Sequence, residues 1–467
     1  MPALLVLCAA QFMVILDITV VNVALPSIQA DLGIATADLQ WLVTAYTLAF
    51  GGLLLLGGRM ADLLGRRRVF LAGLGVFTAA SAGAALADAT ATLIAARIGQ
   101  GVGAAMLSPA ALSLVTTTFT EPGERRRALA TWAAVAAGGG AFGVLAGGVL
   151  TETLGWEGIF LVNVPVGIAV AIAALRMLPA GRPQMRGRVD LAGALLATAS
   201  LVALIYGLVE APDVGWGSER TIGLFALAAV GLAGFVAVEA SVHEPLVALR
   251  VFRRRTTATA LVLMVAGMGT VMSAFFFLSQ YLQHVLGHSA LQTGFEFLPG
   301  AILLVAAAHG GGHLVGHLGA KAVLAAGMAL GGAGALLLSG VPADGSYVAD
   351  VLPGLLVLDV GVGLAASAIF IAAMAGVPAH EAGVVSGLTT TAHELGVALV
   401  LPVLSTVAIS AAGGGTLAAG ALDAAAATDG IASAFTGAAA IAVGAAALAL
   451  ALLRRSDVAD AQPSFAH

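Results

Sequence analysis

Charged side chains are scarce in this sequence. Of its 467 residues, 20 are Lys or Arg and 25 are Asp or Glu, which together make up 10% of the chain. Soluble globular domains carry roughly 25% charged residues, so this composition excludes a water-soluble protein. The net charge of −5 comes without any basic patch, and we therefore expect no nucleic acid partner.

Cysteine, lysine and aromatic residues are also rare. The single cysteine, Cys8, excludes an internal disulfide and a Cys-based metal site. The 6% aromatic content and the lack of short alternating segments argue against an outer-membrane barrel. The only lysine, Lys321, is followed by Ala322, so the phosphate-binding loop of an ATP-driven pump is missing. The motifs G-x-S-x-G, H-E-x-x-H and C-x-x-C are missing as well, and we expect no enzyme activity.

Hydrophobic residues, in contrast, make up 60% of the chain, and the mean hydropathy is +1.03. Runs of about 20 apolar residues predict membrane-spanning helices. The first run has no charged leader and no small-residue cleavage site, so we interpret it as a span and not as a signal peptide. Fourteen spans are predicted, at 4–27, 40–58, 69–87, 91–118, 128–150, 157–178, 190–210, 221–240, 257–283, 293–313, 321–340, 351–376, 383–411 and 430–453.

The basic residues predict the orientation of these spans, because Lys and Arg concentrate in cytoplasmic loops. If the N-terminus is cytoplasmic, 18 of the 20 basic residues fall in the connections after even-numbered spans or at the C-terminus. The exceptions are Arg220, in an outer connection, and Arg97, inside a span. Acidic residues gather in the outer connections. We therefore expect both termini in the cytoplasm.

A repeated segment relates the two halves of the chain. Residues 57–73 read GGRMADLLGRRRVFLAG and residues 311–327 read GGHLVGHLGAKAVLAAG, with seven identical positions at a constant offset. The first copy links spans 2 and 3, and the second links spans 10 and 11. Parallel halves of this kind are a transporter architecture with a substrate site between them near the midplane. We predict a six-helix bundle over 1–180, an inserted helix pair with its linkers over 181–250 and a second six-helix bundle over 251–467.

Four motifs stand in order across spans 1 to 6. They read LDITVVNVALPSI from Leu16, GGRMADLLGRRR from Gly57, ARIGQGVGAAMLSPAAL from Ala96 and GAFGVLAGGVLTETLGWEGIFLVNVPVGI from Gly140. With these motifs the chain resembles the fourteen-span drug–proton antiporters of the major facilitator superfamily (EmrB/QacA type), over nearly its whole length. The resemblance implies an all-α membrane protein with the major facilitator fold, two six-helix bundles plus two inserted helices. It also implies transport driven by a proton gradient without a cofactor.

Two charged residues lie deep inside predicted spans. A charge there costs at least ~2.5–3.5 kcal/mol, so it should face a cavity or a partner. At 1.5 Å per residue, Asp17 lies ~20 Å from the cytoplasmic start of its span and Arg97 ~10 Å from the outer end of its span. These are similar depths in a core ~30 Å thick. We interpret Asp17 as a proton-exchanging group tuned by Arg97, which resembles the family's coupling arginine; a fixed structural ion pair is the alternative.

The connection between spans 2 and 3 resembles the family's cytoplasmic gate. By that resemblance, Asp62 forms a latch with nearby arginines that stabilises one access state, while the glycines permit tight turns. The alternative is a simple positive-inside anchor, which is our interpretation of the run from Arg66 to Arg68. In the second copy His313 and Gly316 replace Arg59 and Asp62, so a second latch is expected to be weak or absent. The predicted gate comprises Gly58, Arg59, Asp62, Gly65 and Arg66.

Span 5 carries glycines at intervals of four, a stripe that permits close helix packing. The stripe resembles the antiporter motif of exporters and comprises Gly139, Gly143 and Gly147, with Gly148 beside it. Simple close packing is the alternative reading. Two positions depart from the family pattern: Val144 stands where the family usually has the proline that kinks this helix, and Glu157 stands where a basic residue is common.

Polar residues in the spans are candidates for a substrate cavity. Asp359 is a candidate for binding a cationic substrate or a second proton. Glu394 beside His393 is a candidate for a proton path, with a structural hydrogen-bonded pair as the alternative. Glu296 is a further candidate for a functional acid, and Glu239 is interpreted as structural. His309, His313 and His317 share one helix face, but we predict no metal site there. The predicted cavity residues are Asn22, Gln100, Asp359 and Glu394.

Together these features predict a proton-coupled exporter of drugs, antibiotics or other small amphipathic or cationic compounds. We expect a multi-pass monomer in the plasma membrane of a bacterium, with protons and membrane lipid as its other partners. A dedicated exporter of one endogenous metabolite, such as a self-made antibiotic, is the main alternative. An uncoupled channel is a further alternative, although a channel does not predict the repeat or the paired buried charges.

Overall fold

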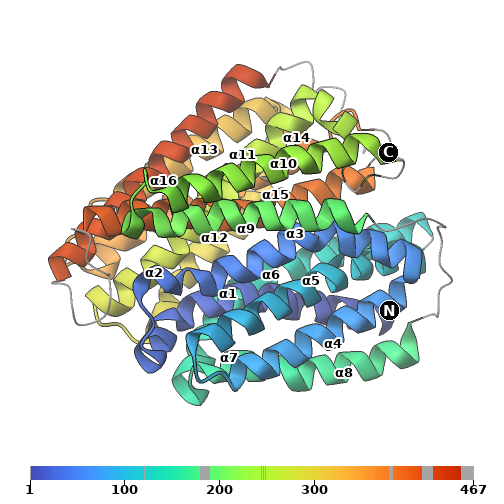
Figure 1. Cartoon of the computed structure of the whole chain (residues 1–467), viewed down its shortest axis with the longest axis horizontal. Coiled ribbons are helices and arrows are strands. Elements are labelled where there is room, and N and C mark those ends of the chain that lie inside the picture. The colour runs from blue at the N-terminus through green and yellow to red at the C-terminus, as the bar shows by residue number, and fades with distance from the viewer. Residues whose placement is uncertain are drawn as a thin grey trace.

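The computed structural model of the chain describes residues 2–119, 121–178, 190–242, 245, 247, 249–377, 382–412 and 424–453. Within these residues every regular element is helical, so the predicted fold class is confirmed (Figure 1). The elements are α1 (Pro2–Leu32), α2 (Thr36–Leu39), α3 (Trp41–Leu64), α4 (Arg66–Ala85), α5 (Thr90–Thr118), α6 (Pro122–Leu154), α7 (Glu157–Leu161), α8 (Asn163–Met177), α9 (Leu191–Val214), α10 (Glu219–Ser241), η1 (Leu249–Arg253), α11 (Arg255–Gln280), η2 (Tyr281–Val285), α12 (Ala290–Leu318), α13 (Ala320–Leu338), η3 (Tyr347–Val351), α14 (Leu352–Met374), α15 (Ala382–Ala411) and α16 (Ala424–Leu452).

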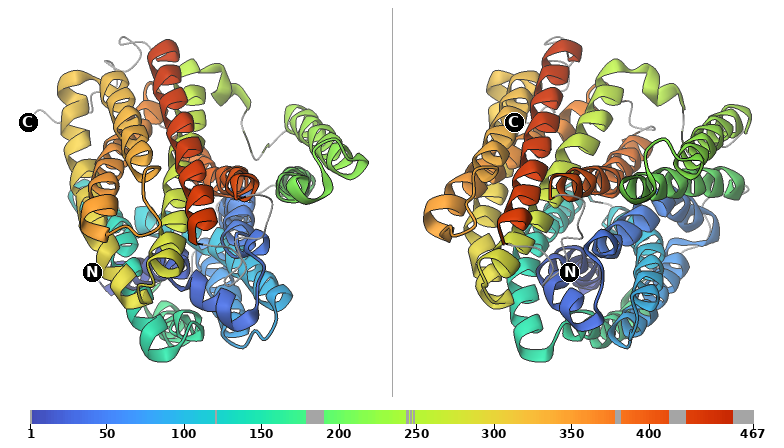
Figure 2. Two further views of the ribbon diagram at one scale, coloured as in Figure 1. Left: turned by 90° about the vertical axis from the view of Figure 1, so that its left-hand side faces the viewer. Right: turned by 60° about the vertical axis from the view of Figure 1, so that its left-hand side comes forward.

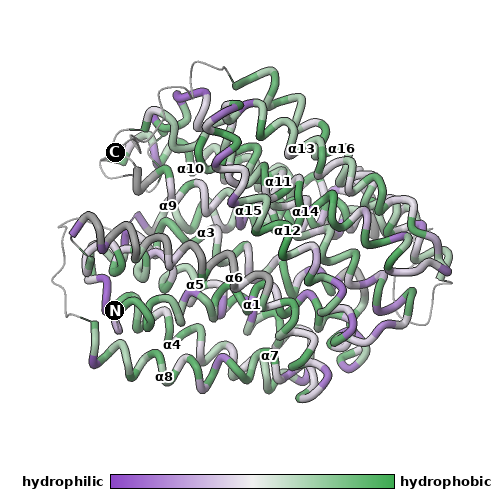
Figure 3. Tube along the Cα trace, turned by 180° about the vertical axis from the view of Figure 1, so that it is seen from behind, coloured by the Kyte–Doolittle hydropathy of each residue, from purple (hydrophilic) through white to green (hydrophobic). Residues whose placement is uncertain are grey.

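Each predicted span coincides with one long helix, or with the α7–α8 pair for 157–178. Twelve helices in the described residues are long and apolar enough to cross a membrane. The other two, α6 and α9, contribute shorter described apolar stretches, Phe142–Leu154 and Ala192–Leu208, so the count of fourteen spans stays a prediction. Hydrophobic character follows most of each helix, and hydrophilic segments gather mainly toward the helix ends (Figure 3).

The helices form two groups with a hairpin beside them. Helices α1 and α3–α8 pack with one another, as do α11–α16, and α9 pairs with α10 (Figure 2). Helix α9 also contacts α3 of the first group and α15 of the second. At this seam Thr406 of α15 donates a hydrogen bond to the Leu208 carbonyl over 3.2 Å. The rings of Trp41 on α3 and Tyr206 on α9 lie 6.1 Å apart. The domain boundaries near residues 180 and 250 stay predictions.

The repeated segment takes the same conformation in both groups. Gly65 joins α3 to α4 with φ +98°, and Gly319 joins α12 to α13 with φ +80°, a region that favours glycine. About two turns further on, Gly73 packs against backbone atoms of Gly103 in α5. In the second copy Gly327 packs in the same way against the backbone of Gly361 in α14. The sequence repeat therefore corresponds to an equivalent helix pair in each half, α3–α4 and α12–α13.

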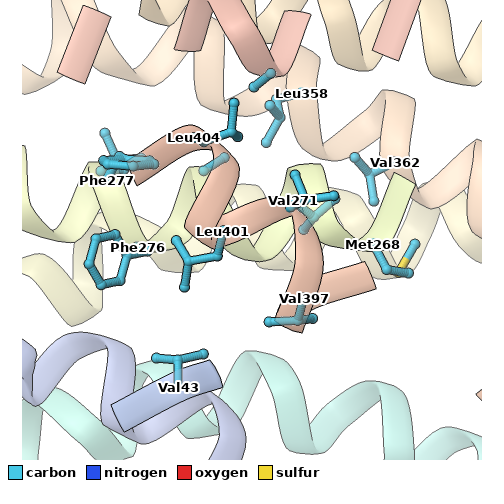
Figure 4. Packing of buried hydrophobic residues seen from close by; sticks show 14 of the residues in the cluster. Val43, Met268, Val271, Phe276, Phe277, Leu358, Val362, Val397, Leu401 and Leu404 are labelled. Carbon is cyan, nitrogen blue, oxygen red and sulfur yellow. The ribbon is translucent and has the colours of Figure 1, made fainter. Parts of the chain in front are cut away.

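Buried hydrophobic side chains form a small cluster inside the first group and a larger one that extends across both groups. The larger cluster joins α11, α14 and α15 and reaches α3. Figure 4 shows Val43 of α3 with Val397 and Leu401 of α15 and Val271 of α11. The two halves are thus in direct apolar contact.

Close helix packing in the second half depends on small residues. A Cβ added at Gly334 of α13 would overlap the backbone of Leu358 in α14, whereas a Cβ at Gly444 of α16 would meet nothing within 4 Å. We expect Gly334→Ala to cost about 1–3 kcal/mol through overpacking. Gly444→Ala should be neutral or slightly stabilising, because Ala has the higher helix propensity. Thermal unfolding of the two purified variants in detergent checks this, and equal midpoints would contradict it.

Candidate functional site

An ion pair lies in the interior of the first helix group. Arg97 on α5 donates to Asp17 Oδ2 on α1 over 2.6 Å, and the two side chains are 1% and 0% exposed. The same guanidinium donates to the Leu42 carbonyl on α3 over 2.7 Å and to Gln100 Oε1 over 2.9 Å. Its carbon lies 4.3 Å from the centre of the Tyr46 ring, a cation–π contact. Arg97 is therefore bound on all sides by protein.

The second oxygen of Asp17 is bound just as completely. Its Oδ1 accepts hydrogen bonds from Gln100 Nε2 and Asn163 Nδ2, both over 2.8 Å. Gln100 also donates to Ser81 Oγ on α4 over 2.9 Å. A break between α7 and α8 at Val162 places Asn163 at the start of α8, where it faces the cluster. Three donors on one buried carboxylate stabilise its ionised form.

A cavity of about 360 Å³ lies beside this cluster, between the two helix groups. Its wall comes from α1, α3, α5 and α6 of the first group and from α11, α12, α14 and α15 of the second. Most lining side chains are apolar, including the aromatic rings of Phe50, Phe275, Phe297 and Phe370. A mostly apolar cavity with a few polar groups is the usual form of a small-molecule site.

Few polar groups line the cavity, and two of them have an atom without a partner in the described residues. Glu394 on α15 is 4% exposed; its Oε1 bonds with Nδ1 of the adjacent His393 over 3.0 Å, and its Oε2 is unpaired. Asn22 on α1 likewise has an unpaired Oδ1. Gln11 accepts a hydrogen bond from Ser108 over 2.9 Å. The unpaired oxygens of Glu394 and Asn22 are themselves buried, so each lacks the hydrogen bond that a buried polar atom normally has.

The two halves are in contact at the end of the cavity that the charge pattern predicts to be the outer one. Ser279 of α11 donates to the Asn22 carbonyl, and Gln283 of η2 donates to the Val23 carbonyl, both over 2.8 Å. Helix α6 packs there on α12, where a Cβ at Gly148 would lie 2.7 Å from the Ala290 carbonyl oxygen. Each of these contacts joins the two halves.

Two of the four predicted cavity residues lie elsewhere. Asn22 and Glu394 are part of the described cavity wall, whereas Gln100 and Asp359 are not. Gln100 belongs instead to the Asp17–Arg97 cluster, because it sits one helical turn beyond Arg97 on the face toward α1. Asp359 is fully buried between α14 and α12, where a Cβ at Gly300 would overlap its carboxylate. The functional roles assigned to these residues stay predictions.

The glycine stripe of α6 faces α1. Added Cβ atoms would meet Ile15 at Gly139, Thr19 at Gly143 and the Val20 carbonyl at Gly147. Gly148, next in sequence, faces α12 of the other half instead. Helix α6 runs unbroken from Pro122 to Leu154 with valine at position 144, and the Val144 side chain lines the cavity.

The predicted gate lies at the α3–α4 connection. Gly58 lies near Pro109 of α5, and Gly65 takes the positive φ described above. The side chain of Asp62 is outside the described residues, so its latch with Arg59 or Arg66 stays a prediction. The neighbouring Arg67 donates to the Leu175 carbonyl over 2.5 Å and thereby ties α4 to α8.

The remaining polar candidates have local partners. Glu296 on α12 accepts from Gln292 over 3.0 Å and bonds with His288 over 2.9 Å. Glu239 accepts a hydrogen bond from the Val247 amide over 2.9 Å. The rings of His309 and His313 lie 5.5 Å apart, and no group of three or more metal-ligating side chains is found in the described part of the chain.

The sequence did not single out three members of the buried cluster. Tyr46, Ser81 and Asn163 are polar residues in apolar spans, and Asn163 stands in the quoted motif FLVNVPVGI. Their polarity at mid-span depth could have identified them as candidates. Hydropathy alone, however, does not predict whether such a side chain faces the buried cluster or another neighbour.

Comparison with known proteins adds relatives along most of the chain. The family model described as Major Facilitator Superfamily matches residues 7–401. The chain is 44% identical to the cephamycin export protein CmcT of Amycolatopsis lactamdurans, over 88% of this chain and 86% of the relative. It is 40% identical to a puromycin resistance protein of Streptomyces alboniger, over 87% of this chain and 82% of the relative.

Solved structures share the fold. A bacterial homolog of the human lysosomal transporter Spinster matches with a TM-score of 0.69 at 18% identity, covering 99% of this chain and 98% of that one. A POT family peptide transporter also matches with a TM-score of 0.69, at 16% identity, covering 97% and 98%.

The buried pair can be tested through stability. Asp17→Asn removes the negative charge and leaves Arg97 charged and buried, so we expect it to cost about 3–5 kcal/mol. The double variant Asp17→Asn/Arg97→Gln removes both charges and should recover at least half of that loss. Chemical unfolding of the purified variants in detergent measures both values, and a double variant less stable than Asp17→Asn alone would contradict the pairing.

Proposed function

Since the chain belongs to the Major Facilitator Superfamily, we propose that it exports small amphipathic compounds in exchange for protons. The chain is a membrane transporter and not an enzyme. The observation that carries the proposal is the cavity between the two halves, beside a buried carboxylate–guanidinium pair. The fourteen-span branch, both termini in the cytoplasm, a monomeric state and the plasma membrane of a bacterium are parts of the same proposal. A proton gradient supplies the energy, and no cofactor is needed.

The cavity favours amphipathic compounds with a basic nitrogen. Its lining in the described residues contains one carboxylate, Glu394, and no Lys or Arg. Oε2 of that carboxylate is buried without a donor in the described residues, and a cationic group of the substrate would supply one. Phenylalanine faces nearby attract cations as well as apolar groups. Anionic compounds would place their charge beside Glu394, and the described wall has no Lys or Arg to compensate it, while His393 there is already bonded to Glu394.

Helix α1 provides the physical link between substrate and proton. Asp17 lies on its face toward Arg97, while Ile18, Thr19 and Asn22 lie on its face toward the cavity. A substrate that shifts α1 therefore also shifts Asp17 relative to Arg97. Separation from Arg97 removes the main cation that keeps Asp17 ionised, and the carboxylate then accepts a proton. Return of α1 restores the pair and releases the proton.

Dedicated export of one endogenous metabolite is the second candidate, since one relative is named as a cephamycin export protein. A drug-susceptibility panel on a host with and without the chain separates the two. Hypersensitivity to many amphipathic cations on deletion favours broad export, and sensitivity to a single compound favours the dedicated role.

Coupling can be tested in everted membrane vesicles that hold a pH gradient. We expect substrate addition to dissipate the gradient, and Arg97→Ala to lower this substrate-induced proton flux by about tenfold or more, because Asp17 loses its partner. Arg220→Ala is the control: Arg220 pairs with Glu210 over 2.8 Å on the exposed hairpin, and such pairs contribute about 0–1 kcal/mol. Full coupling in the Arg97 variant would refute the proposed role.

Substrate chemistry can be tested with purified protein. Glu394→Gln should weaken binding of a lipophilic cation such as ethidium by about tenfold or more, because a charge-assisted contact is worth roughly 1.5–3 kcal/mol. A neutral compound of similar size should bind within about twofold of the unaltered protein. Glu296→Gln, which alters a carboxylate outside the described cavity wall, is the control. Titration calorimetry gives the affinities, and unchanged cation binding by Glu394→Gln would contradict the assignment.

A further inference from the structure

Asp359 is a buried acid that the proposed proton exchange at Asp17 does not use. It is the eighth residue of α14, its side chain is 0% exposed, and neither carboxylate oxygen has a hydrogen-bond partner in the described residues. Asp17, which is also 0% exposed, has three donors. Hydrogen bonds therefore stabilise an ionised carboxylate at Asp17, whereas none does so at Asp359.

The surroundings of Asp359 are apolar and tight. A Cβ at Gly300 of α12 would overlap Asp359 Oδ2, so glycine is what leaves room for the carboxyl group between α12 and α14. On the other side of α14, Leu358 packs against Gly334 of α13. An ionised carboxylate without donors is strongly disfavoured in such an environment, whereas a protonated one is tolerated.

The carboxyl group lies one layer behind the cavity wall. Phe297 and Ala301 of α12, three residues before and one after Gly300, both line the cavity. So does Val362, one turn after Asp359 on α14. A small separation of α12 from α14 at Gly300 would therefore bring water from the cavity to Asp359.

Few other charges face this position. Lys321 is at the opposite end of α13, because Gly327, Gly331 and Gly334 run antiparallel to α14. On α12, Glu296 lies one turn from Gly300 and is bonded to His288. The remaining titratable groups on the elements packed against α14 are Arg255 on α11, Tyr347 and Asp350 on η3, His309, His313 and His317 on α12, and His393 and Glu394 on α15.

We propose that Asp359 is a second proton-binding site, which holds its proton in this conformation and releases it when α12 separates from α14 at Gly300. The proton passes from the carboxylic acid to water that enters from the cavity, which leaves a carboxylate and a hydronium ion. In the return step the carboxylate is protonated again before the helices close. This inference rests on the proposed proton-coupled export and adds a proton carried by the C-terminal half.

The test uses the full-length chain purified and reconstituted in proteoliposomes, with ethidium as the probe. Asp359→Asn keeps the shape of the neutral acid but carries no proton, so ethidium counterflow should stay within about twofold of the unaltered protein. With a pH gradient of about one unit, the loss of one exchanged proton should lower ethidium accumulation by about tenfold. Asp350→Asn is the control, because Asp350 already accepts a hydrogen bond from the Ser346 amide over 2.7 Å; it should change neither readout.

Infrared difference spectroscopy provides a readout that does not depend on transport. The unaltered protein should show the carbonyl band of a protonated carboxylic acid that Asp359→Asn lacks. The inference would be overturned if this band is absent or if Asp359→Asn leaves ethidium accumulation unchanged. It would also be overturned if the Asn variant fails to fold or loses counterflow, because a neutral side chain should fit the site. Failure of the unaltered protein to accumulate ethidium would instead overturn the proposed function.

Discussion

The pairing of Arg97 with Asp17 is the interaction on which the first half of the molecule depends. In a membrane no solvent compensates a buried charge, so each charge must find its partners within the protein. Here the guanidinium and the carboxylate bind groups from α1, α3, α5 and α8, and Gln100 extends the network to Ser81 of α4. The cluster thus fixes the relative positions of five helices from separate parts of the sequence. It also leaves α1 with one polar face toward the cluster and another toward the cavity.

Apart from that cluster, helix association relies on close packing. Lipid tails are as apolar as leucine side chains, so the hydrophobic effect gives little reason for helices to meet. Small residues take over this role, and glycines bring backbones into contact where α4 meets α5 and where α13 meets α14. The same glycines recur in the sequence repeat, at Gly73 and Gly327. The repeat is therefore visible in the sequence because it preserves helix contacts.

The sequence predicted the helices well and the directions of their side chains less well. Each span is a distinct apolar run between charged or glycine-rich connections, so its position is encoded locally. The depths of Asp17 and Arg97 follow from residue counting, and the structure pairs the two residues. Gln100 and Asp359, in contrast, were expected on the cavity wall and lie elsewhere. A helix such as α14 is apolar on all sides, because apolar side chains suit both its lipid-facing and its protein-facing surfaces. Hydropathy therefore does not predict which side of such a helix faces the cavity.

The α9–α10 hairpin makes the two sides of the molecule unequal. Helix α9 touches α3 through Trp41 and Tyr206 and touches α15 through Thr406 and Leu208. On the opposite side α6 and α12 meet directly, backbone to backbone, at Gly148 and Ala290. On the first side α3 and α15 also meet directly, so motion of one half against the other changes that contact and at least one contact of α9, whereas on the second side α6 and α12 part. The two halves are related by the sequence repeat, but the hairpin between them makes the two sides of their interface different. The axis about which one half moves against the other is therefore expected to lie nearer to the hairpin.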